Sequence, residues 1–206
     1  MSETTIVHLL RHGKVENPRG VLYGRLPDFH LSGDGRAMAA AAADFFAGRP
    51  VVSLFASPLD RAVETATPVA ERLGLPILTD ARLIESGNRF EGQHHPLRKP
   101  VNWPWLVNPF RPSWGEPYLD VVARMRAVLA TATQAARGRE AVCVSHQLPI
   151  WVTRLAAEER RLWHNPALRE CALGSVTSFT FDGDRLTAVG YTVPPRSQVP
   201  DPDAAQ

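Results

Sequence analysis

The sequence predicts a three-layer α/β/α sandwich with a mostly parallel central sheet and an antiparallel hairpin at one edge. Short apolar runs alternate with helical segments, and two segments of alternating polarity joined by a Gly-containing turn follow near the C-terminal end. The chain has 206 residues, 44% of them apolar, which suits one buried core. We expect a single domain over residues 1–193, with a loop insertion at about 86–117 and a disordered tail over 194–206.

The N-terminal segment is expected to form a strand followed by a helix. The apolar, partly β-branched run 5–10 is typical of a strand buried on both faces. Ser32 and Asp34 offer N-caps to the alanine-rich stretch 36–46, and Gly48 marks its end. This is the clearest helix signal in the chain's first quarter.

A second strand, over 51–56, leads into a helix-start pattern. Ser57-Pro58-Leu59-Asp60 combines an N-cap serine, a proline at the first helical position and an acid three residues after the cap. The helix should continue towards Leu73, and Pro68 inside it predicts a kink or local break. A third short strand follows at 76–79.

Residues 85–117 are rich in Gly, Pro, His, Trp and Asn and show little periodicity. Long loops in compact domains are usually functional or mobile. Four tryptophans lie in or shortly after this stretch, and they form either a wall for a substrate or a small core of the loop itself: Trp103, Trp105, Trp114 and Trp151.

Regular spacing returns after the loop. Helical spacing covers 119–136, an apolar strand covers 141–145, and a further helix is expected over 148–156. The alternating segments 175–181 and 185–191 predict the edge hairpin.

Composition excludes several classes of protein. A formal charge of +2 without a block of like charges lacks the footprint of a nucleic-acid binder. The sequence shows neither a signal peptide nor an apolar run of about 18 residues, so we expect a cytoplasmic protein without a membrane partner. Cys143 and Cys171 show no zinc or redox spacing, and Cys143 reads as a buried hydrophobe. A monomer and a homodimer both stay open.

Polar residues follow three of the predicted strands. They are Arg11-His12, Ser57 with Arg61, and Ser145-His146. Ligands of such sheets collect at the carboxyl ends of the strands. Two imidazoles and two guanidinium groups at one edge would form a positive pocket in which one ring can act as a nucleophile. A phosphoryl group suits this pocket, because forked arginines supply charge-assisted contacts to its oxygens.

The ordered motifs over about residues 5–150 resemble the histidine phosphatase superfamily, which includes the cofactor-dependent phosphoglycerate mutases. A lone Arg-His-Gly would be a weak signal, but several motifs in order are specific. The matching segments are Leu10-Arg11-His12-Gly13, Tyr23-Gly24-Arg25, Leu31-Ser32-Gly33-Asp34-Gly35-Arg36, the segment from Ser57 to Ala66, Leu83-Ile84-Glu85 with Glu91-Gly92, and Val144-Ser145-His146.

The resemblance implies a role for each matching residue, together with a phosphoglycerate mutase-like fold and no metal or cofactor. His12 would accept the phosphoryl group, and Arg11, Arg61 and His146 would complete the phosphate pocket. Glu85 would protonate the leaving oxygen and later deprotonate water, which needs a carboxyl with a raised pKa. The residues implied to contact substrate are Asn17, Gly24, Ser57 and Gln147.

Three positions depart from the family pattern. Gln147 stands where glycine is usual, so a side chain adds a donor or narrows the pocket. Asn17 falls one residue early, and Pro117 replaces a frequent serine and its substrate contact.

Some residues have a simpler interpretation. His8 shares strand parity with His12, but a mid-strand histidine is more often a satisfied core group. His94-His95 is expected to be a solvated loop pair rather than a metal site. Glu91 and Glu116 compete with Glu85 for the acid role, and motif context favours Glu85.

The function predicted from the sequence is a phosphomonoester hydrolase that acts on a small phosphorylated metabolite through a phosphohistidine. One alternative is a phosphoglycerate mutase-like phosphotransferase, which shares the first half-reaction. Another is a catalytically weak phospho-ligand binding module, because fold alone does not guarantee activity.

Overall fold

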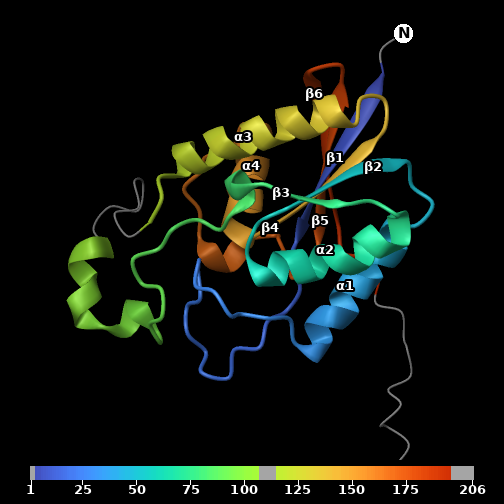
Figure 1. Cartoon of the computed structure of the whole chain (residues 1–206). Coiled ribbons are helices and arrows are strands. Elements are labelled where there is room, and N and C mark those ends of the chain that lie inside the picture. The colour runs from blue at the N-terminus through green and yellow to red at the C-terminus, as the bar shows by residue number, and fades with distance from the viewer. Residues whose placement is uncertain (1–2, 107–114, 196–206) are drawn as a thin grey trace, which may run out of the picture.

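A six-stranded sheet with the strand order β3-β2-β4-β1-β5-β6 runs through the middle of the molecule (Figure 1). The computed structural model describes residues 3–106 and 115–195. Strands β1 to β4 are parallel, and β5 and β6 form the antiparallel edge that the sequence predicts. The strands are β1 (Thr4–Arg11), β2 (Val51–Ala56), β3 (Ile77–Thr79), β4 (Glu140–Ser145), β5 (Val176–Asp182) and β6 (Arg185–Thr192).

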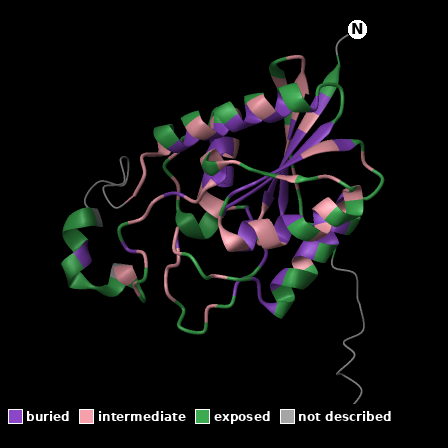
Figure 2. Ribbon diagram, viewed as in Figure 1, coloured by how far each residue is buried: buried purple, intermediate pink, exposed green. Residues whose placement is uncertain are grey.

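Two pairs of helices cover the two faces of the sheet, which confirms the three-layer prediction. Helices α1 (Gly33–Phe46) and α2 (Asp60–Leu73) pack on one face, and α3 (Tyr118–Ala135) and α4 (Gln147–Ala157) on the other. Figure 2 shows the buried residues concentrated in the central strands and on the inner sides of the helices. In β1, Val7 and Leu9 pack towards α3 while Leu10 packs towards α1 and α2, so this strand is buried on both faces as expected.

The two predicted helix caps have different outcomes. Ser32 caps α1, since its hydroxyl accepts a hydrogen bond from the Gly35 amide at 3.1 Å. The prediction for Ser57 is wrong, because α2 begins at Asp60 with Leu59 at the cap position and no side-chain cap. The Ser57 hydroxyl accepts from the Leu59 amide at 3.4 Å, ahead of the helix, and lies 2.7 Å from Nε2 of His146 at the end of the neighbouring strand β4. Helix α2 is continuous across Pro68.

The insertion after residue 85 contains short 3-10 helices over Pro96–Arg98 and Pro100–Leu106. Figure 1 shows these residues lying to one side of the sandwich. Trp103 and Trp105 are exposed, whereas Trp151 is buried in α4. Trp114 lies outside the described residues, as does most of the predicted tail, residues 196–206. Across the described ranges, no helix combines the length and the apolar character that a membrane span needs.

Candidate functional site

The carboxyl ends of β1, β2 and β4 bring three predicted site residues together. The backbone amide of His12 donates to the Ser145 carbonyl at 3.1 Å, which extends the β1–β4 ladder. The amide of Ser57 donates to the Val144 carbonyl at 2.9 Å on the β2 side of the same strand. The rings of His12 and His146 consequently lie with their centroids 5.1 Å apart. Strand register alone therefore assembles the centre of the site.

His12 is held as a neutral ring with one nitrogen free. Nδ1 lies 2.7 Å from the Gly13 carbonyl, which can only accept, so Nδ1 carries the proton and Nε2 has the lone pair. Burial, with the charges of Arg61 and Arg11, lowers the His12 pKa to about 3. The next residue must be glycine, because a Cβ at Gly13 would come within 2.5 Å of a backbone oxygen of Gly35.

Among the described residues, the guanidinium groups of Arg11 and Arg61 bond to backbone carbonyls and form no ion pair with a carboxylate. Arg11 donates to the Cys171 carbonyl at 2.6 Å, and Arg61 donates to the Gly24 carbonyl at 2.5 Å. Arg61 is 1% exposed and lies 4.8 Å from the ring centre of Tyr23. Within residues 3–106 and 115–195, neither arginine has an ion pair, and both Nε atoms are buried without a partner. Such donors are costly to bury unless an anion binds them.

His146 adds a second neutral imidazole. Its Nε2 lies 2.7 Å from the Ser57 hydroxyl, while Nδ1 is buried with no partner in the described part of the chain. Burial and the neighbouring His12 hold the pKa of His146 well below its usual range. A proton on Nδ1, with Nε2 accepting from Ser57, would make this ring a further hydrogen-bond donor.

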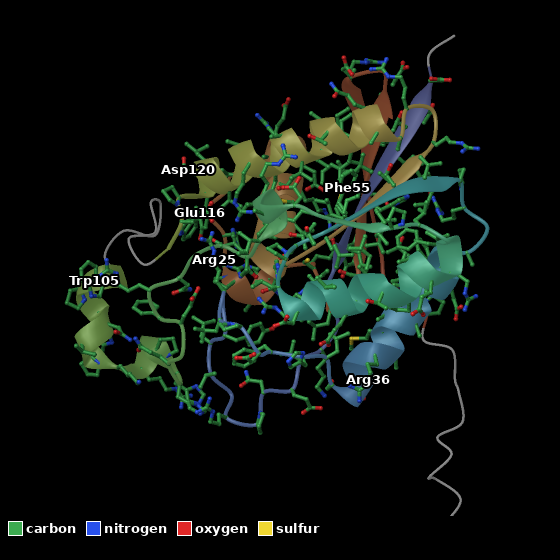
Figure 3. All side chains as sticks on the ribbon, viewed as in Figure 1. Arg25, Arg36, Phe55, Trp105, Glu116 and Asp120 are labelled. Carbon is green, nitrogen blue, oxygen red and sulfur yellow. The ribbon has the colours of Figure 1, made fainter. Side chains whose placement is uncertain are left out.

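Glu85 differs from the two competing glutamates. Burial raises the pKa of Glu85, against the opposing effects of the Ser86 amide, Arg61 and Arg11. Glu116 forms ion pairs with Arg25 and Arg124, and Figure 3 shows Arg25 and Glu116 side by side. Glu91 accepts hydrogen bonds from two backbone amides. Glu85 is therefore the carboxyl whose surroundings favour the protonated form.

A cavity of about 260 Å³ opens above these groups. Five of the predicted site residues lie in its wall: Arg11, His12, Gly24, Glu85 and Gln147. Three others are buried behind the wall: Arg61 contacts Gly24, His146 contacts His12, and Ser57 contacts His146. Asn17 is the exception, because its amide bonds twice to the Val21 backbone and it lines a separate surface hollow.

Sequence comparison identifies the family of the chain. A model of the histidine phosphatase superfamily (branch 1) matches residues 7–194. The chain belongs to this superfamily. It is 54% identical over 199 residues to an uncharacterized protein of Mycobacterium tuberculosis, an alignment that covers 94% of this chain and 98% of the relative.

Solved structures of a mycobacterial phosphatase resemble this one. The native structure of a mycobacterial glucosyl-3-phosphoglycerate phosphatase has a TM-score of 0.75 and 27% identity, covering 92% of this chain and 98% of that one. A complex of that phosphatase with inorganic phosphate has a TM-score of 0.72 and 27% identity, covering 91% and 95%.

Residues outside the predicted set also line the cavity of this superfamily member. They are chiefly Tyr23, Asn88, Tyr118 and Arg169. Tyr23 belongs to the motif segment Tyr23-Gly24-Arg25, so the motif could have identified it as a residue of the cavity. Arg169 comes from the connection between α4 and β5, and no sequence pattern marks it. It donates to Gln147, the residue that stands where glycine is expected.

The histidines outside the motifs have structural or surface positions. His8 is buried and bonded to Glu140 and Ser178, as expected for a satisfied core group. His94 and His95 are exposed. Among the described residues, one trio has potential metal-ligand atoms within 4.8 Å of one another, and none of its members lines the cavity: Asp28, His30 and Asp60.

Proposed function

We propose that this protein is a phosphomonoester hydrolase that transfers the phosphoryl group of a small metabolite first to His12 and then to water. One observation carries the proposal. A buried neutral imidazole with a free Nε2 stands beside two guanidinium groups that have no carboxylate partner among the described residues. This combination suits an attacking nucleophile and a phosphate dianion.

In the first half-reaction, the Nε2 lone pair of His12 attacks phosphorus in line, and the bond from phosphorus to the ester oxygen breaks. Arg11, Arg61 and the Nδ1 proton of His146 stabilise the charge on the equatorial oxygens. Glu85 gives its proton to the leaving oxygen, so the alcohol departs neutral.

In the second half-reaction, water attacks the phosphohistidine and the N–P bond breaks. The carboxylate of Glu85 removes a proton from the attacking water and is protonated again for the next cycle. Phosphate leaves, and His12 returns to the neutral form. This scheme needs no metal, because cationic side chains balance the negative charge of the phosphoryl oxygens.

The two alternatives differ from hydrolysis in testable ways. A mutase would return the phosphoryl group to a retained intermediate, so it would release little phosphate. A phospho-ligand binding module would have no use for a proton donor, and Glu85 with its raised pKa argues against it. The likeness to a phosphatase over most of the chain supports the hydrolase.

The test is a panel of phosphate esters assayed with a metal chelator present, with and without the His12→Ala substitution. We expect phosphate release from the unmodified protein, and rapid quenching with a labelled ester should trap an acid-labile, base-stable phosphoenzyme. His12→Ala should lose both signals. Turnover that survives in His12→Ala, or a label on another residue, would overturn the proposal.

A further inference from the structure

A third guanidinium group, that of Arg169, lines the cavity beside the groups proposed to carry the reaction. Electrostatic interactions link it to both Glu85 and Arg11. The proposed phosphoryl transfer uses Arg11 and Arg61 and gives Arg169 no role. Its charge therefore needs a separate explanation.

Two neutral side chains hold Arg169 in place. Its Nε donates to Nε2 of His164 at 2.8 Å, and its Nη1 donates to the Gln147 side-chain oxygen at 3.3 Å. His164 is fixed in the accepting tautomer because its Nδ1 donates to the Leu162 carbonyl at 2.6 Å. Burial lowers the pKa of His164, so the ring stays neutral. The Gln147 side chain, at a position where glycine is expected, thus helps to orient Arg169.

Arg169 keeps its binding capacity. A guanidinium has five N–H donors, and two of those of Arg169 are engaged by residues that the structure describes. In residues 3–106 and 115–195, Arg169 forms no ion pair, unlike Arg25, another arginine near the cavity, which pairs with Glu116. Arg169 is half-buried, and even partial burial of a cation without a counter-charge is unfavourable unless a ligand supplies one.

Charge matching indicates the ligand. Arg11 and Arg61 balance the two charges of a phosphoryl group, which leaves one positive charge at Arg169. We propose that Arg169 is a specificity-determining residue that binds a carboxylate of the substrate, so that the enzyme prefers phosphate esters that carry a carboxylate. The inference rests on the proposed function, because it takes the phosphoryl group to occupy the His12 end of the cavity. A second phosphoryl group would bring two charges to this single guanidinium in a cavity of about 260 Å³.

The test compares three esters with one spacer: the phosphate ester of 3-hydroxypropionate, its primary amide, and 1,3-propanediol bisphosphate. We expect the carboxylate ester to exceed the amide in kcat/KM by roughly 10- to 100-fold, as for a charge-assisted hydrogen bond. Arg169→Gln should bring this ratio close to one, mainly through KM, and Arg169→Lys should restore part of it. Arg185→Gln, at the exposed start of β6, is the matched control and should leave the ratio intact.

Three outcomes would overturn the inference. One is an unmodified enzyme that does not distinguish the acid from the amide, and another is a preference for the bisphosphate over the carboxylate. The third is an equal loss on all esters in Arg169→Gln with the basic limb of the pH profile moved upward. Arg169 lowers the pKa of Glu85, so removing Arg169 would raise that pKa and move the basic limb upward. This result would mean that Arg169 acts by tuning Glu85 and not by binding a carboxylate of the substrate.

A binding measurement separates this inference from the proposed function. Phosphonates are not cleaved, so calorimetry with 4-phosphonobutyrate and its amide reports recognition without turnover. Tighter binding of the acid that disappears in Arg169→Gln supports the inference even if no ester is hydrolysed, which would reject the hydrolase alone. Hydrolysis without any such binding preference would reject the inference alone.

Discussion

Two buried histidines on or next to β1, His8 and His12, lie four residues apart and have opposite surroundings. His8 lies 3.0 Å from a carboxylate oxygen of Glu140 and 2.8 Å from the Ser178 hydroxyl. The same carboxylate accepts two hydrogen bonds from Arg49, at 2.7 and 3.0 Å. Every charge in this cluster therefore has a partner within the fold.

The surroundings of His12 contain cations that bond to backbone carbonyls and not to carboxylates in the described part of the chain. Arg11 and Arg61 have no ion pairs among the described residues, and the nearby carboxyl, Glu85, has a raised pKa. A fold that can place Glu140 beside His8 could equally place an acid beside His12. Charge that is compensated internally serves stability, whereas charge left uncompensated in a cavity is available to a ligand.

The largest expected effect tests whether Glu85 is a proton donor or merely a counter-charge for this cationic site. Glu85→Gln keeps the shape but cannot transfer a proton, so turnover of alkyl phosphates should fall by roughly 10²- to 10⁴-fold. Aryl phosphates should lose much less, since their leaving groups need little protonation. Steady-state kinetics on matched alkyl and aryl esters measures the difference. Glu116→Gln is the control. If Glu85→Gln lowered the turnover of alkyl and aryl esters equally, another residue would have to be the acid.

The second prediction compares the two clusters by substitution. Glu140→Gln leaves Arg49 and His8 without their acid, so the free energy of unfolding should fall by about 3 kcal/mol. Arg61→Gln removes a buried charge that has no ion pair among the described residues, so stability should change little or rise while turnover falls by roughly 100-fold or more. Urea unfolding and ester hydrolysis on both variants check this. A large loss of stability in Arg61→Gln would remove the distinction between the clusters.

The sequence predicted the elements whose signals are local. The apolar run of β1, the Ser32 cap and the edge hairpin all depend on neighbouring residues, and all are confirmed. Ser57 carried an equally good local signal, but the contact of its hydroxyl with His146 comes from a residue 89 positions away. Local capping propensity cannot anticipate a hydrogen bond that only the assembled sheet provides.

The site shows the same division. Strand ends identified Arg11, His12 and His146, because parallel strands deliver their carboxyl ends to one edge. Arg169 reaches the cavity from an irregular connection, where no periodicity indicates direction. The substrate contact expected of Asn17 depended on its place in a motif. In the structure the Asn17 amide bonds to the Val21 backbone in a local turn and does not line the cavity.

The third prediction concerns acid stability, and it uses the low pKa values of the site. The pKa of His12 in the folded protein is about 3, against about 6.5 for a free histidine. Between these pH values the His12 ring binds a proton only in the unfolded chain. The contribution of His12 to the free energy of unfolding is therefore fully present above pH 6.5 and is lost as the pH drops towards 3. The free energy of unfolding should therefore fall with decreasing pH, and His12→Asn should make this fall less steep by about 1.4 kcal/mol per pH unit below pH 6.

Urea unfolding at pH 7, 6 and 5 measures that slope. His30→Asn is the control, because the Glu64 carboxylate raises the pKa of the exposed His30 and its contribution has the opposite sign. An unchanged slope in His12→Asn would mean that folding does not lower the His12 pKa, and would contradict the effect assigned here to burial and the two arginines.

The smallest expected effect is stabilisation by an anion, and it follows directly from the uncompensated charge. Vanadate or inorganic phosphate at ten times its dissociation constant should stabilise the protein by about 1.4 kcal/mol, which raises the melting temperature by roughly 3–6 °C. Glu140→Gln should keep this shift, since its cluster has no place for an anion, whereas Arg61→Gln should lose it. A shift retained in Arg61→Gln would locate the anion elsewhere and show that the unpaired guanidinium groups beside His12 are not its binding site.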